Sequence, residues 1–101
     1  MSAPFDEPTL AAELELLPKW TGDRSHIERT VLLPAHLDAE VRRRVATVAD
    51  EVDHHPNVED VPDGTRYVVW THTCNGVTER DVDLAERIDR IVAEATGFRD
   101  L

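Results

Sequence analysis

Apolar residues recur at helical spacing in three segments of the chain. They lie three or four positions apart in residues 7–17 and 37–52, and again after Thr78. This spacing predicts three helices that each bury one face, the first ended by Pro18 and the last by Gly97. The apolar positions are Leu10, Ala11, Leu14 and Leu17, then Leu37, Val41, Val45, Val48 and Val52, then Val82, Ala85, Ile88, Ile91, Val92 and Ala95.

Three other segments favour strands. Residues 26–33 and 65–73 are rich in β-branched and aromatic side chains, and residues 57–61 form a shorter candidate strand. The predicted order is helix, strand, helix, strand, strand, helix, with a Pro-Asp-Gly turn at residues 62–64. We therefore expect one α+β domain over residues 1–101, with helices packed on one face of a small, mainly antiparallel sheet.

The composition of the chain argues against some classes of binding partner and some cellular compartments. The 101 residues include 21 acidic and 11 basic ones, a formal net charge of -10, which argues against direct nucleic-acid binding or an anionic membrane surface. Lys19 is the only lysine, as in proteins from high-salt or GC-rich sources. No apolar run approaches the roughly 20 residues of a membrane span, and the N-terminal residues lack the pattern of a secretory signal. With Cys74 the only cysteine, no intrachain disulfide forms, and we expect a cytoplasmic protein.

Polar residues gather near the ends of the predicted elements, where a rigid scaffold presents functional groups. They are Asp50 with His54 and His55, which Pro56 follows, then Thr71 with His72, then Thr78 with Asp81. On a helix, Asp50 and His54 share a face and can form a hydrogen bond. His54 and His55 point in different directions, so one can face a pocket while neighbours anchor the other. Thr78 is a predicted N-cap, and Asp81 occupies the acidic position of a capping box.

Several other residues suggest weaker alternatives. A small metal-binding protein is one, but the two adjacent histidines diverge and paired zinc-ligand spacings are missing, so we expect no metal site. Cys74 is expected to be an incidental thiol rather than a nucleophile. Tyr67 and Trp70 are expected to pack, whereas Trp20, in a connecting loop, is the aromatic residue best placed to line a ligand site. His26 and His36 are expected on the surface.

Taken together, the histidine and aspartate positions resemble the pterin-4a-carbinolamine dehydratases. The pattern of that family is an acidic residue, three positions, and His-His-Pro. It continues with Thr-His at a strand end and with Gly-hydrophobic-Thr-x-x-Asp at the start of the last helix. The matching positions in this chain are Asp50, residues 54–56, residues 71–72 and residues 76–81, and the resemblance extends over about residues 10–95.

The resemblance implies a reaction and a set of site residues. The reaction removes water from 4a-hydroxytetrahydropterin and gives quinonoid dihydropterin, without a metal or a bound cofactor. His55 and His72 would be the acid–base pair, His54 would assist and help hold the pterin, and Asp81 would orient a histidine. Asp50 would bind the donor edge of the pterin. We also expect Trp20, Pro56 and Thr71 to contact the substrate. The resemblance also implies homodimers joined through sheet edges, which helices can pair into homotetramers.

The chain departs from the family pattern in its first strand and beyond. Residues 31–33 are aliphatic where the family is rich in aromatic side chains, and Pro62 stands at a position that is often aromatic. These departures motivate one alternative, a non-catalytic relative that acts as a dimerisation or assembly partner.

Overall fold

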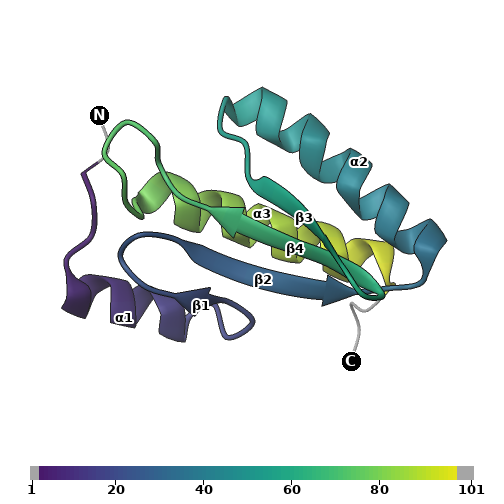
Figure 1. Cartoon of the computed structure of the whole chain (residues 1–101), viewed down its shortest axis with the longest axis horizontal. Coiled ribbons are helices and arrows are strands. Elements are labelled where there is room, and N and C mark those ends of the chain that lie inside the picture. The colour runs from purple at the N-terminus through teal and green to yellow at the C-terminus, as the bar shows by residue number, and fades with distance from the viewer. Residues whose placement is uncertain (1–2, 98–101) are drawn as a thin grey trace.

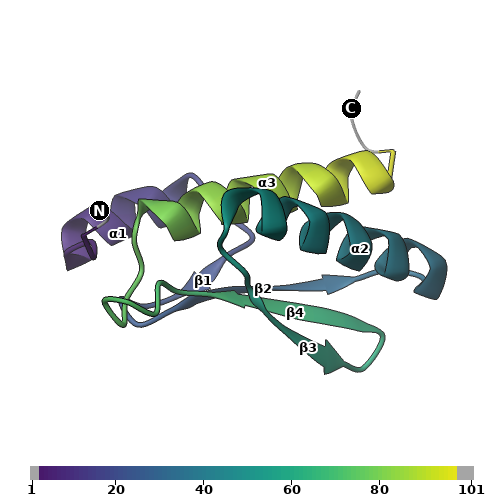
Figure 2. The same cartoon turned by 90° about the horizontal axis from the view of Figure 1, so that it is seen from above.

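Three helices cover one face of a four-stranded sheet, and no helix formed by residues 3–97 covers the opposite face (Figures 1 and 2). The computed structural model describes residues 3–97. The elements are α1 (Glu7–Glu15), β1 (Thr21–Gly22), β2 (Ile27–Leu32), α2 (Ala35–Val52), β3 (Asn57–Val61), β4 (Gly64–Val69) and α3 (Glu79–Ala95). The strand order is β1-β2-β4-β3, and every neighbouring pair is antiparallel. The predicted α+β class and the helices on one face of the sheet are confirmed.

Local signals in the sequence set the ends of the helices. Asp6 caps α1 by accepting a hydrogen bond from the Thr9 N–H at 2.9 Å. Thr78 caps α3, and with Asp81 it forms the predicted capping box, in which each side chain accepts a backbone N–H. α2 ends differently, because Asp53 adopts a left-handed conformation with φ of 54° and turns the chain away from the helix axis.

The core lies between the helices and the sheet. Antiparallel pairing aligns Ile27 of β2 with Val69 of β4, and both side chains are fully buried. The helices α2 and α3 meet the same layer with apolar side chains that are also fully buried, Val41, Val45, Leu84, Ala85 and Ile88. Burial of this layer fixes the register of β4, and therefore the place where that strand ends.

Two strand predictions differ from the structure. The polar connection after Trp20 contains a two-residue edge strand, β1, in which Gly22 pairs with Ile27. Gly22 has φ of 147°, and a Cβ there would lie 2.3 Å from the His26 carbonyl oxygen, so only glycine permits this close pairing. The strand predicted for residues 65–73 ends at Val69, and beyond it only Thr71 makes an isolated bridge, to Gly76.

Within residues 3–97, no helix is both long and apolar enough to cross a membrane.

Candidate active site

The two adjacent histidines leave α2 at its C-terminal turn. The Asp53 N–H donates to the carbonyl groups of Ala49 and Asp50, and the His54 N–H also donates to Ala49. The left-handed backbone at Asp53 then directs His54 and His55 toward β3. Because Asn57 of β3 pairs with Val68 of β4, the residues just before Asn57 lie beside those just after Val68. This pairing brings the histidine pair to the Thr71–His72 segment.

Asp81 connects three segments at the base of this region. Its side chain is fully buried, and its Oδ1 lies 2.5 Å from His54 Nε2. Its Oδ2 accepts hydrogen bonds from the Thr71 hydroxyl at 2.8 Å and from the Thr78 N–H at 2.9 Å. An ionised carboxylate has no hydrogen to donate, so His54 Nε2 is the donor toward Asp81. Asp81 therefore holds one histidine, the segment that follows β4 and the first turn of α3 in a single network.

Asp50 contacts His55 and not His54, so the predicted pairing of Asp50 with His54 is wrong. His55 Nε2 lies 2.8 Å from Asp50 Oδ1. The prediction assumed that the helix continues through His54, whereas α2 ends at Val52 and the chain turns at Asp53. As a result, His54 points inward with 9% of its side chain exposed, and His55 points outward with 57% exposed.

His72 lies in the turn that follows β4. The Thr71 N–H donates to the Gly76 carbonyl at 2.9 Å, and the Asn75 N–H donates to the His72 carbonyl at 3.3 Å. These bonds close the turn, and the Thr71 hydroxyl ties it to Asp81. The backbone of His72 is therefore anchored, although the side chain itself is exposed.

A cavity of about 320 Å³ opens where these segments meet. The predicted site residues that line it are His54, His55, Thr71 and His72. Asp81 and Asp50 lie behind the first two histidines and hydrogen-bond to them, and Pro56 directly follows His55. The structure thus brings three imidazoles to one cavity and supports two of them with carboxylates. Imidazoles exchange protons near neutral pH, so this arrangement suits general acid–base chemistry.

Trp20 is the predicted site residue that lies elsewhere. Only 3% of it is exposed, within the core, and its indole N–H donates to Asp89 at 2.9 Å. Arg29 shares the same carboxylate oxygen. The loop position suggested an accessible ring, but apolar burial and the hydrogen bond to the half-buried Asp89 hold Trp20 between the sheet and α3.

Three further residues line the cavity, namely Asp53, Thr73 and Arg80. The Arg80 guanidinium donates to the Asp53 carbonyl at 2.8 Å, which joins the first turn of α3 to the turn before His54. Thr73 and Arg80 were missed in the sequence. Their sequence positions could have indicated them, because Thr73 directly follows His72 and Arg80 directly precedes Asp81.

The placement of potential metal ligands bears on whether the site could hold a metal ion. Across the described part of the chain, no group of three or more His, Cys, Asp or Glu side chains is placed to hold a metal ion.

Comparison with known proteins identifies the family. The sequence profile described as pterin 4 alpha carbinolamine dehydratase matches residues 3–91. A protein of Mycolicibacterium smegmatis, provisionally named a pterin-4-alpha-carbinolamine dehydratase, is 38% identical over 82% of this chain and 89% of its own. A Nocardia farcinica protein with the same provisional name is 35% identical over 86% and 93% of the two chains. A crystal structure of a transcriptional coactivator/pterin dehydratase from Brucella melitensis superposes with a TM-score of 0.84 at 25% identity, covering 89% of this chain and 99% of that one. The chain belongs to the pterin 4 alpha carbinolamine dehydratase family.

Proposed function

We propose that this chain is a hydro-lyase that converts 4a-hydroxytetrahydropterin to quinonoid dihydropterin. The observation that supports this proposal best is the meeting of His54, His55 and His72 at one cavity, with Asp81 behind His54. These residues occupy the positions at which the chain resembles the family pattern. A cavity of about 320 Å³ is also of a size suited to a small ligand.

The reaction requires two proton movements and no change in oxidation state. The C4a–O bond breaks, and the hydroxyl group takes a proton and leaves as water. The adjacent ring nitrogen loses a proton, and its electron pair forms the new carbon–nitrogen double bond. One group must therefore donate a proton while another accepts one, which two imidazoles on opposite sides of the pterin can do.

His55 and His72 are the proposed acid–base pair. Both side chains are exposed at the cavity, so each can exchange protons with substrate and solvent. His54 has its Nε2 engaged by Asp81, which leaves Nδ1 for the pterin and suits a binding role. Asp81 and Asp50 act as positioning residues for His54 and His55. Thr71 and Pro56 complete the proposed substrate contacts.

Turnover of synthetic 4a-hydroxytetrahydropterin by the purified protein tests the proposal. We expect a rate well above that of buffer, and a loss of about 100-fold or more in kcat/KM for His55→Ala and for His72→Ala. His36→Ala is the matched control, because His36 is an exposed histidine near the start of α2 and is not a cavity residue. A wild-type rate equal to buffer would overturn the proposal, and so would full activity in both site variants. An inactive wild type that forms a stable complex with another protein would instead favour the non-catalytic alternative.

The proposal also includes an oligomeric state and a cellular location. We propose a homodimer or homotetramer, supported by β3, an edge strand whose outer backbone groups are free to pair with another strand. Light scattering coupled to size-exclusion chromatography measures the oligomer mass directly, and a monomer at micromolar concentration would contradict this part. A cytoplasmic location is proposed from the single cysteine, Cys74.

A further inference from the structure

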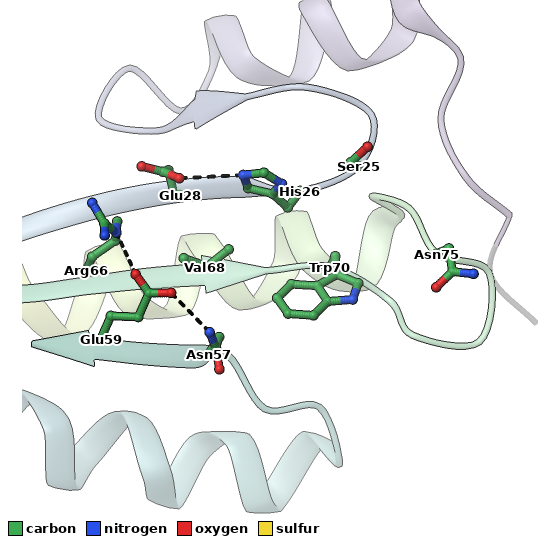
Figure 3. A pocket seen from close by; sticks show the side chains of 9 residues that line it. All are labelled: Ser25, His26, Glu28, Asn57, Glu59, Arg66, Val68, Trp70 and Asn75. Atoms are coloured by element: carbon green, nitrogen blue, oxygen red, sulfur yellow. Dashed lines mark hydrogen bonds and ion pairs between the residues drawn. The ribbon is translucent and has the colours of Figure 1, made fainter.

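Trp70 lies between the histidine cavity and a second hollow on the open face of the sheet. This hollow has a volume of about 780 Å³, and its lining includes Val68 of β4 and Trp70, the residue directly after β4 (Figure 3). The indole ring of Trp70 lies beside the His72 imidazole, with ring centroids 4.6 Å apart and planes inclined by 33°. Aromatic rings attract one another at centroid distances of about 4.5–7 Å, so the two side chains are in favourable contact.

Strand geometry explains why these two rings meet. Side chains two positions apart in an extended segment point to the same face. Val69 and Thr71 point inward, with 0% and 2% exposed, so Trp70 between them points toward the open face. His72 follows Thr71 in the turn, where its exposed ring lies against the indole. The bonds that close the turn at residues 71–76 then keep the His72 backbone next to the indole.

The three cavity histidines differ in what holds their rings. His54 is hydrogen-bonded to Asp81, and His55 to Asp50. The His72 imidazole makes no hydrogen bond or ion pair with any other group in residues 3–97. Instead, its ring contacts the indole of Trp70. An exposed imidazole with an anchored backbone and no polar partner would otherwise rotate about its side-chain bonds.

We propose that Trp70 is the positioning residue of His72, which it holds toward the cavity by contact between the rings. This inference rests on the proposed function, in which His72 exchanges a proton with the pterin. A group that only positions an acid or base affects the chemical step more than substrate binding. The loss of Trp70 should therefore lower kcat and leave KM nearly unchanged.

The test compares Trp70→Leu, Trp70→Phe and His26→Ala in the full chain. His26 is the control because it lines the same hollow from the β2 side without belonging to the histidine cavity. We expect Trp70→Leu to lower kcat by about threefold to tenfold with KM within about twofold. Trp70→Phe, which retains a ring, should keep most of the activity, and His26→Ala should match the wild type.

Proton NMR of the histidine rings provides a readout that does not depend on turnover. The His72 resonances are assigned by their disappearance in His72→Ala. We expect the indole ring current to shift them in the wild type and expect Trp70→Leu to abolish this shift. An unchanged His72 spectrum in Trp70→Leu would overturn the inference, as would a raised KM with unchanged kcat, which would make Trp70 a substrate contact. A wild type without activity would overturn the proposed function, while the ring shift would still decide whether Trp70 holds His72.

Discussion

His54 Nε2 lies 2.5 Å from Asp81 Oδ1, although 27 residues separate the two in the chain and Asp81 is fully buried. Both oxygens of Asp81 are used, since Oδ2 accepts from Thr71 and Thr78. Burying a carboxylate costs folding free energy unless its oxygens accept hydrogen bonds, and both oxygens of Asp81 accept them. The same side chain therefore caps α3 and fixes a histidine at the cavity, so its loss should affect both stability and activity.

Asp81→Asn should reduce both. The amide has nearly the same shape but carries no charge, and its NH₂ group cannot accept the bonds that one carboxylate oxygen accepts. We expect the free energy of unfolding to fall by about 1–3 kcal/mol, as for other buried hydrogen bonds to charged groups. We expect kcat/KM to fall by about 100-fold, because His54 loses the partner that orients it. Urea denaturation and turnover measure the two effects.

Asp83→Asn is the matched control for this variant. Asp83 lies two residues further along α3 and is exposed, and its one side-chain partner among residues 3–97 is Arg87, one turn away. Such surface pairs contribute less than about 0.5 kcal/mol. If Asp83→Asn and Asp81→Asn had equal effects, the buried network would not be what distinguishes Asp81.

Asp50→Asn should have a smaller effect than Asp81→Asn. The Asp50 and His55 side chains are 77% and 57% exposed, so water and salt screen their interaction. We expect kcat/KM to fall by less than about tenfold, and the difference from the wild type to shrink as ionic strength rises. Glu51→Gln, at the exposed neighbouring position on α2, is the control. A large rise in KM for Asp50→Asn would show instead that Asp50 binds the pterin directly.

Arg80→Gln should loosen the turn that presents the two histidines. Arg80 donates to the Asp53 carbonyl, and the His54 N–H donates to Ala49 in the same turn. Loss of the Arg80 bond should cost about 1 kcal/mol and should speed hydrogen exchange at the His54 amide. We expect kcat/KM to fall by about threefold to tenfold. Arg90→Gln, at an exposed position later in α3, should change neither quantity, and unchanged exchange in Arg80→Gln would contradict the prediction.

Tyr67 should make the fold sensitive to alkali. The side chain is fully buried and its hydroxyl is the one buried side-chain polar atom without a hydrogen-bond partner in the described residues. Burial, with a smaller contribution from Asp38, raises the pKa of Tyr67 from 10.0 to about 12. The folded state therefore favours the protonated phenol. The contribution of this phenol to the free energy of unfolding is fully present below pH 10.0 and is lost as the pH rises toward 12.

The size of this loss is about 2 kcal/mol, and Tyr67→Phe should abolish it. The phenylalanine variant should also be equal to the wild type or about 1 kcal/mol more stable at neutral pH, because it removes an unpaired buried hydroxyl. Denaturation of both proteins across the alkaline range measures the difference. Tyr67 is the only tyrosine, so the absorbance of phenolate reports its ionisation directly. Parallel alkaline curves for the two proteins would contradict the prediction.

Local signals in the sequence determined the elements and most of the site residues. Helical spacing, the capping box at Thr78 and Asp81 and the turn at residues 62–64 act over a few residues, so they can be read along the chain. The His-His-Pro and Thr-His motifs are likewise local, so the sequence alone indicates His54, His55 and His72 as site residues.

Only the tertiary structure decided which side chains meet. Asp50 pairs with His55 because the left-handed backbone at Asp53 turns the chain, and helical spacing no longer applies beyond that point. Trp20 lies in the core because Asp89, far along the chain, offers its indole a partner. Arg80 reaches the site because the first turn of α3 lies against the turn at Asp53, and Trp70 contacts His72 because the closed turn at residues 71–76 follows β4. Sequence periodicity describes the faces of single elements, whereas these contacts depend on where separate elements are packed against one another.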